Sequence, residues 1–276
     1  MGFGDAVQPE EDPDIDWVAK LSGRPRPDAA AAVEEARAAR WLYRYLAREH
    51  EREGRSSYIE IDAPLELYAF VRLLRPRHVV EVGVSSGVSS AYLLEGLARN
   101  GTGTLHSIDL PKLDRRPPEG RSRASWSLPA GRGSGWAVPF RLRGRWDLRL
   151  GDKSAILPLF AEELPVIDLL VYDVPHEDRA TRREFARLDA LVPVGAVAIV
   201  DHGPGGSLCA ALDGWARRWG SEPRGRKGLG LYGARRRGSA PGGAGAPKSS
   251  SERSMRARFR SSPGGPRRTS RTRRNP

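Results

Sequence analysis

The chain has 276 residues, 39% hydrophobic and 29% charged, which is enough for one large domain with its own core. No apolar stretch approaches the roughly 20 residues that a membrane-spanning helix needs, and the acidic N-terminus lacks the pattern of a signal peptide. We therefore expect a cytoplasmic protein without a membrane span. Cys209 is the only cysteine, which excludes an intramolecular disulfide and a cysteine metal cluster.

The formal net charge of +12 is concentrated at one end of the sequence. Residues 235–276 hold thirteen Lys or Arg and a single acid, Glu252, so the remainder is formally neutral. This segment is rich in Arg, Ser, Gly and Pro and poor in apolar residues, which predicts a basic disordered tail. Such a tail could bind the phosphates of nucleic acid. Because aromatic residues for base stacking are not interleaved with the charges, an extension without function is the favoured alternative.

Residues 1–27 are acidic and contain several prolines, which predicts a flexible leader. Asp28 can cap an alanine-rich helix that runs to about Glu53, within an N-terminal helical extension of residues 28–58. Apolar side chains recur in this helix at helical spacing: Trp41, Leu42, Tyr45 and Leu46. Their stripe predicts packing against the domain or against a second subunit in a homodimer.

A helix at about residues 64–74 precedes the most informative stretch of the chain, residues 78–90. Valines around Glu81 predict a buried strand, Gly83 and Gly87 permit a tight turn, and the serines that follow can begin a helix. The turn lacks the Gly-Lys-Ser/Thr of a phosphate-binding loop and the G-x-G-x-x-G of a dinucleotide site. An acid before the turn suits a cationic ligand better than a pyrophosphate.

A second strand is predicted at residues 104–109, and it ends in Asp109. This is the place where nucleotide-binding α/β proteins hold ribose hydroxyls. The alternative is an ordinary crossover between two strands, with Asp109 in solvent.

Five segments together resemble class I S-adenosylmethionine-dependent methyltransferases, and among them the catechol-type small-molecule O-methyltransferases. They are Glu81-Val82-Gly83-Val84-Ser85-Ser86-Gly87, Ser107-Ile108-Asp109, Gly151-Asp152-Lys153-Ser154, the run from Ile167 to Asp173 and the run from Gly195 to His202. The resemblance implies an α/β domain over residues 59–234. Its fold would be a doubly wound, mostly parallel, seven-stranded Rossmann-like sheet with helices on both faces.

The resemblance also implies residues that bind S-adenosylmethionine. Glu81 and Asp109 would hold the nucleoside end, and the turn after residue 151 would border the adenine. The full expected set is Glu81, Gly83, Ser85, Gly87, Ser89, Asp109, Asp152, Lys153 and Asp173. For Asp152 there is a simpler alternative, in which it only caps the helix that follows.

Strands at residues 168–172 and 196–200 deliver Asp173, Asp201 and His202 to one edge of the sheet. Two carboxylates and an imidazole could hold a divalent cation there, with magnesium or manganese favoured over zinc. The resembling branch has Asp, Asp and Asn at these positions, so His202 is a departure. The alternative is that both carboxylates only bind loop amides and the amine of the cofactor.

His176 is the candidate general base, because an imidazole with an ordinary pKa of about 6.5 can accept a proton near neutral pH. It lies three positions after Asp173, where the resembling branch has a lysine that removes the proton of the substrate hydroxyl. Pro175 departs from the usual turn. A histidine with a surface or structural role is the alternative.

A long segment at residues 110–145, rich in Pro, Gly and Arg, separates the second strand from a third at residues 146–150. Its length favours a lid or substrate loop, and Trp126, Trp136 and Phe140 indicate that part of it packs. A poorly ordered surface insertion is the alternative.

These features predict methyl transfer from S-adenosylmethionine to an oxygen of a small-molecule acceptor. Two other hypotheses stay open. The first is a cofactor-binding protein whose active site has degenerated, and the second is a nucleic-acid-associated protein that acts through its tail.

Overall fold

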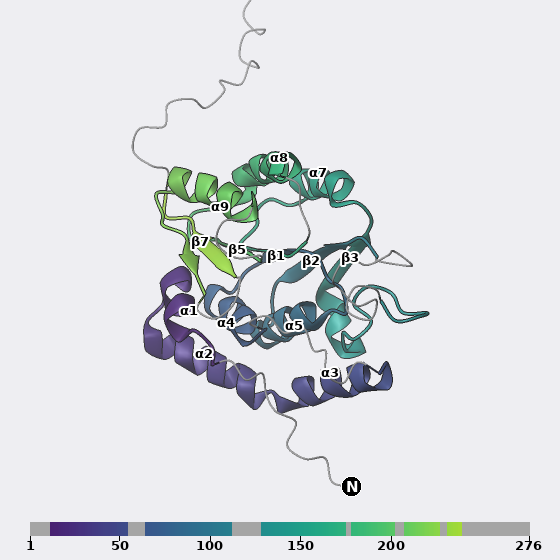
Figure 1. Ribbon diagram of the computed structural model, residues 1–276. Coiled ribbons are helices and arrows are strands. Elements are labelled where there is room, and N and C mark those ends of the chain that lie inside the picture. The colour runs from purple at the N-terminus through teal and green to yellow at the C-terminus, as the bar shows by residue number, and fades with distance from the viewer. Residues whose placement is uncertain are drawn as a thin grey trace, which may run out of the picture. The chain divides into compact units, whose positions relative to one another are not determined.

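The computed structural model describes residues 12–54, 64–111, 128–174, 178–201, 207–226 and 231–238. Seven strands form one sheet in the order β3-β2-β1-β4-β5-β7-β6 (Figure 1). The strands are β1 (His78–Val82), β2 (Thr104–Asp109), β3 (Trp146–Leu150), β4 (Leu169–Tyr172), β5 (Val197–Val200), β6 (Arg224–Gly225) and β7 (Tyr232–Arg235). The first five are parallel, and β7 is antiparallel to both of its neighbours. The predicted mostly parallel α/β sheet is confirmed.

The order of the strands follows from their sequences. All four residues of β4, Leu-Leu-Val-Tyr, are buried, and so are all four of β5. Strands that are apolar on both sides need a helix layer on each face, so they take the middle of a parallel sheet. β3 contains Asp147 and Arg149 and lies at the edge.

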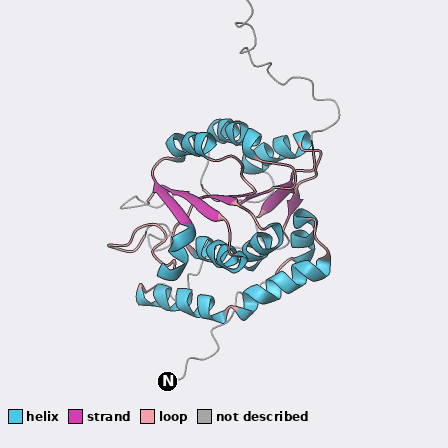
Figure 2. Ribbon diagram, turned by 180° about the vertical axis from the view of Figure 1, so that it is seen from behind, coloured by secondary structure: helices cyan, strands magenta, loops and turns pink. Residues whose placement is uncertain are grey.

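Helices cover both faces of the sheet (Figures 1 and 2). One face packs against α7 (Lys153–Glu163), α8 (Asp178–Leu188) and α9 (Ser207–Arg218). The other packs against α4 (Pro64–Leu74) and α5 (Val88–Asn100), with α1 (Ile15–Ser22), α2 (Arg26–Ala38) and α3 (Arg40–Arg52) further toward the N-terminus. Short 3-10 helices occupy Phe140–Arg145 and Asp189–Leu191. The predicted helix at residues 64–74 is therefore confirmed.

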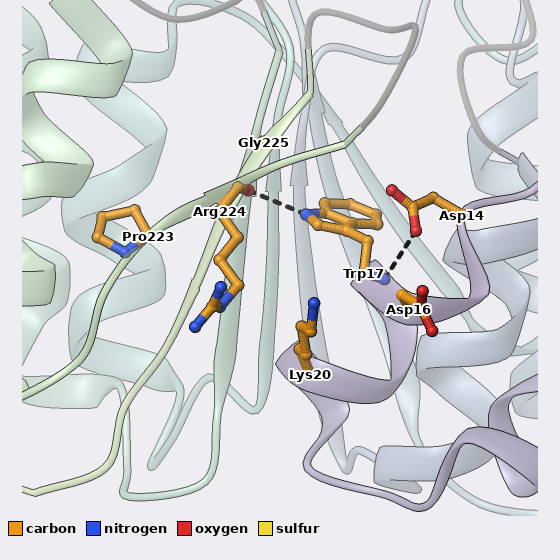
Figure 3. A pocket seen from close by; sticks show the side chains of 7 residues that line it. All are labelled: Asp14, Asp16, Trp17, Lys20, Pro223, Arg224 and Gly225. Atoms are coloured by element: carbon orange, nitrogen blue, oxygen red, sulfur yellow. Dashed lines mark hydrogen bonds between the residues drawn. The ribbon is translucent and has the colours of Figure 1, made fainter.

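The N-terminal segment differs from the predicted leader, because α1 is part of the core. Asp14 caps this helix by accepting a hydrogen bond from the Trp17 backbone N–H at 2.9 Å, and Gly23 ends it in a left-handed conformation. Trp17 and Val18 are buried, and the Trp17 indole donates to the Arg224 carbonyl at 2.9 Å (Figure 3). The prediction of a flexible leader is thus wrong for residues 12–27, since their apolar side chains find partners far along the chain.

The helix predicted from Asp28 to about Glu53 is two helices. The chain changes direction at Ala39, whose φ and ψ of −75° and 44° are not helical, and α2 already begins at Arg26, after Pro25. On α3, Leu42 and Leu46 are fully buried within the chain itself. Packing against the domain, one of the two alternatives for this stripe, accounts for them.

The folded part extends beyond the predicted start of the tail. Arg235 is the last residue of β7, and Arg236 exchanges backbone hydrogen bonds with Gly195 and Ala196 at 2.8 and 2.9 Å. Residues 239–276 lie outside the described residues. Within the described ranges, none of the helices combines the length and the apolar character that crossing a membrane requires.

Candidate active site

The carboxyl ends of four neighbouring strands bring the predicted acids to one edge of the sheet (Figure 1). Val82 pairs with Ile108 on one side and with Tyr172 on the other, so Gly83 lies between the ends that carry Asp109 and Asp173. Tyr172 in turn pairs with Val200, which places Asp201 next along the edge. This is where open parallel sheets bind their ligands.

Glu81 is part of the interior rather than of the exposed edge. Its carboxylate has no exposed surface and accepts hydrogen bonds from the hydroxyls of Ser89, Ser90 and Ser107 at 2.6 to 2.7 Å. Burial raises its pKa above the ordinary value of a glutamate, although the three hydroxyls oppose this shift. Glu81 therefore ties the glycine turn and the start of α5 to β2. Ser89, which belongs to the predicted cofactor-binding set, has its hydroxyl in the same network.

Asp109 lies at the edge, as predicted, and is 8% exposed. Its Oδ1 accepts the Val84 N–H at 3.0 Å, and its Oδ2 accepts the hydroxyl of Ser134. The carboxylate thus has a fixed orientation beside the glycine turn. Ser85 at the top of this turn is exposed and has a φ of 51°, a left-handed conformation that is rare for serine.

The glycines of the turn are required by the protein's own packing. A Cβ on Gly83 would lie 1.8 Å from the carbonyl oxygen of Asp173, and one on Gly87 would lie 2.5 Å from Cγ2 of Val138. Both glycines also have positive φ, 98° and 93°. The strand ends therefore approach more closely than any side chain would allow.

The C-terminal half of the 110–145 segment packs on this turn. We call residues 128–139 the strap. Its backbone donates from Gly135 to the Ser85 carbonyl at 2.8 Å and from Ala137 to the Ser86 carbonyl at 3.0 Å. Val138 is 1% exposed, whereas Phe140, just beyond the strap, is 88% exposed. Trp126 lies outside the described residues.

Asp152 and Lys153 both make contacts within the protein. Asp152 caps α7 by accepting the Ser154 N–H at 2.7 Å, and this hydrogen bond lowers its pKa. The ammonium of Lys153 lies 2.7 Å from both oxygens of Glu184, a side chain only 3% exposed that also accepts the Tyr172 hydroxyl. This ion pair of buried Glu184 and partly buried Lys153 fixes the first turn of α7 against α8, next to the sheet edge.

Among the residues that the structure describes, no three His, Cys, Asp or Glu side chains form a group that could hold a metal ion. Asp173 and Asp201 both follow buried strands. Their backbone N–H groups donate hydrogen bonds to the carbonyl oxygens of Val82 and Tyr172 at 2.8 and 3.0 Å, respectively. Pro175, His176 and His202 lie outside the described residues. The predicted metal set and the predicted base therefore stay predictions.

Sequence reasoning missed four partners of the predicted residues: Ser90, Ser107, Ser134 and Glu184. Ser107 is the register partner of Glu81, so pairing the two predicted strands could have found it. No pattern in the sequence pointed to Ser134, because its position depends on the path of the strap.

A polar hollow of about 280 Å³ lies elsewhere, between α1 and the edge strand β6 (Figure 3). Its lining combines carboxylates with cations and includes Asp14, Asp16, Lys20 and Arg224. The indole of Trp17 closes part of it by its hydrogen bond to β6. Because the lining carries both negative and positive charges, it favours neither an anionic nor a cationic ligand.

Residues 80–202 match a family model described as a methyltransferase domain. Among the solved structures that are similar to this chain are three methyltransferases. An O-methyltransferase from Bacillus cereus in complex with S-adenosylhomocysteine is 14% identical, with a TM-score of 0.46 over 69% of this chain and 89% of that chain. TomG, an O-methyltransferase from Streptomyces achromogenes, is 18% identical, with a TM-score of 0.46 over 71% and 89%. A methyltransferase from Geobacter sulfurreducens is 17% identical, with a TM-score of 0.44 over 84% and 94%.

No curated protein sequence matches this chain. The family match lies within the predicted domain of residues 59–234 and contains all five of the segments that carry the resemblance. Together with the strand order, it confirms that resemblance. Over residues 80–202 the chain is thus similar to methyltransferase domains, and its strand order agrees with the sheet that the resemblance implies.

Proposed function

We propose that this protein transfers a methyl group from S-adenosylmethionine to an oxygen of a small molecule. The observation that carries the proposal is the sheet edge, where Asp109, Asp173 and Asp201 follow neighbouring strands around a glycine turn within a methyltransferase domain. Carboxylates at such an edge suit the ribose hydroxyls and the ammonium group of this cofactor.

The cofactor, when bound, supplies a methyl group that is already reactive on its sulfonium, so the chain has mainly to align the acceptor and remove its proton. In this proposal Asp109 binds the ribose, and His176 accepts the proton of the acceptor hydroxyl. Asp173, Asp201 and His202 together hold magnesium or manganese, which would orient the acceptor oxygen.

Calorimetric titration with S-adenosylhomocysteine tests the cofactor site. Asp109→Asn keeps the shape of the side chain but removes its charge, and it should weaken binding by about 1.5 to 3 kcal/mol, the range for hydrogen bonds to a charged group. Asp16→Asn, an exposed residue of α1, is the matched control and should bind like the wild type. An Asp109→Asn variant with unchanged affinity would show that the ribose lies elsewhere.

Methyl transfer to a panel of hydroxyl-bearing acceptors tests the chemistry. His176→Ala should lower the rate by roughly 100- to 10,000-fold, the contribution of a positioned general base, while S-adenosylhomocysteine affinity is retained. Chelation should reduce turnover, and added magnesium or manganese should restore it. Turnover that survives chelation but requires His176 would leave a base mechanism without a metal.

The methyltransferase domain does not favour the other two hypotheses. A degenerate cofactor-binding protein would bind S-adenosylhomocysteine and transfer no methyl group to any acceptor of the panel. A homodimer through the N-terminal helices stays a prediction, and sedimentation of the full chain checks it.

A further inference from the structure

The orientation of Asp109 depends on a residue outside the strand and the turn. Ser134 lies in the strap, 25 positions after Asp109, and its hydroxyl donates a hydrogen bond to Oδ2 of Asp109. The Val84 N–H donates to Oδ1 at 3.0 Å. The Ser85 N–H donates to the same oxygen at 3.5 Å. Each carboxylate oxygen has two lone pairs, so Oδ2 can still accept a hydrogen bond from a ribose hydroxyl, whereas Oδ1 already has two backbone donors.

The strap is a fixed wall of the site. Two backbone hydrogen bonds join it to the carbonyls of the glycine turn, and the side chains of Trp136 and Val138 are 8% and 1% exposed. Lifting Ser134 away from Asp109 would break these hydrogen bonds and expose both side chains, whereas a ribose hydroxyl would gain only the one bond that Ser134 gave up. We therefore expect the strap to stay in place when the cofactor binds.

The N-terminal helices support the strap from the other side. Arg132 pairs with Glu53, just after α3, at 2.7 Å, and the Trp136 ring lies 4.9 Å from the ring of His50. Gly135 allows the strap to pass β3, because a Cβ there would lie 2.1 Å from the Trp146 ring. The strap thus has contacts on the helix side, on the sheet and on the turn.

We propose that Ser134 is a cofactor-positioning residue. Its hydroxyl holds the carboxylate of Asp109 in the orientation in which Oδ2 receives a ribose hydroxyl, so the strap contributes to the cofactor site. This inference rests on the proposed function, in which Asp109 binds the ribose. According to this proposal, the strap contributes to cofactor affinity in addition to the glycine turn and the strand ends.

The test compares two ligands, S-adenosylhomocysteine and its 2′,3′-dideoxy analogue, by calorimetry on the full chain. Ser134→Ala should weaken binding of S-adenosylhomocysteine by about 3- to 10-fold, the effect of one net hydrogen bond. The wild type and the variant should bind the analogue with the same affinity, because the analogue has no ribose hydroxyl that could bind to Asp109. Ser22→Ala on α1 is the matched control, because its hydroxyl also bonds within the protein.

Each other outcome is decisive. Equal or tighter binding of S-adenosylhomocysteine by Ser134→Ala would overturn the inference, and if Asp109→Asn still weakens binding, the proposed function stands. An equal loss for both ligands would also overturn it, because a loosened strap does not distinguish them. A wild-type protein that binds neither ligand would refute the proposed function and this inference together.

Discussion

At the scale of single residues, the buried carboxylate of Glu81 makes stability depend on pH. Because burial raises its pKa, the folded protein holds this proton more tightly than the unfolded chain does. The stabilisation is complete below the ordinary pKa of 4.5 and is lost as the pH rises through the raised value. The free energy of unfolding should therefore fall over this range because of Glu81.

Denaturant unfolding of Glu81→Gln at several pH values measures this effect. The variant lacks the titrating group, so its stability relative to the wild type should increase as the pH rises above about 4.5. Glu163→Gln provides the contrast, because Arg149 lowers the pKa of that exposed carboxyl and its contribution is lost as the pH falls. A constant difference between Glu81→Gln and the wild type would show that Glu81 titrates normally.

The sequence located the acids of the site but not their partners. Glu81, Asp109 and Asp173 follow from apolar runs with an acid within or at the end of each, a pattern that local sequence contains. The hydrogen-bond donors to Glu81 and Asp109 come from β2, α5, the glycine turn and the strap, so finding them requires the strand register and the path of a long insertion. The same limit applies to Gly83, for which the sequence predicted a tight turn but not the close approach of the Asp173 carbonyl.

At the scale of elements, the stability of α1 depends on its cap. The Asp14 carboxylate accepts the Trp17 N–H, and its loss in Asp14→Ala should cost about 1 kcal/mol of stability, the usual effect of an N-cap. Asp14→Ser should restore most of this, since a hydroxyl caps nearly as well. Asp16→Ala, an exposed position in the same turn, should change stability by less than about 0.5 kcal/mol. Equal values for Asp14→Ala and Asp16→Ala in urea unfolding would contradict this account.

Helices and strands were predictable where the apolar residues follow a clear helical spacing or form a continuous run. The five parallel strands and the helix at residues 64–74 agree with their predicted positions within a residue or so, whereas no positions were predicted for β6 and β7. The prediction failed where tertiary contacts decide. The eight residues of α1 carry an apolar face too short to distinguish from a leader, and the break at Ala39 has no glycine or proline to mark it.

At the scale of the whole molecule, two truncations of the basic C-terminal segment should have different effects on stability. Removal of residues 239–276 takes away ten Lys or Arg but none of the described contacts, so the melting temperature and cofactor affinity should not change. Removal from Arg235 onward also deletes the end of β7 and the hydrogen bond from Arg235 to the Ser22 carbonyl at 2.7 Å. This longer truncation should lower the melting temperature by several degrees, since a loss of about 1 kcal/mol shifts it by roughly 2 to 4 °C in a domain of this size.

The same pair of variants tests the nucleic-acid hypothesis. If the tail binds phosphates, the wild type should retain a nucleic-acid duplex at low salt and release it as salt rises, and the variant without residues 239–276 should not retain it. Retention by that shorter variant would place any such binding on the folded domain instead.

The contact between α1 and the last strands has a consequence for how the chain reaches its native state. Trp17 packs on Phe70 of α4, but its acceptor, the Arg224 carbonyl, lies 207 positions along the chain, so the contact of α1 with β6 can only form once nearly the whole domain has been synthesised. Contacts between residues so far apart form slowly, because a long loop must close first. During refolding, the quenching or shift of Trp17 fluorescence should therefore belong to the slowest kinetic phase. Trp17→Phe should reduce the fluorescence amplitude of that phase, while the other six tryptophans still report on folding.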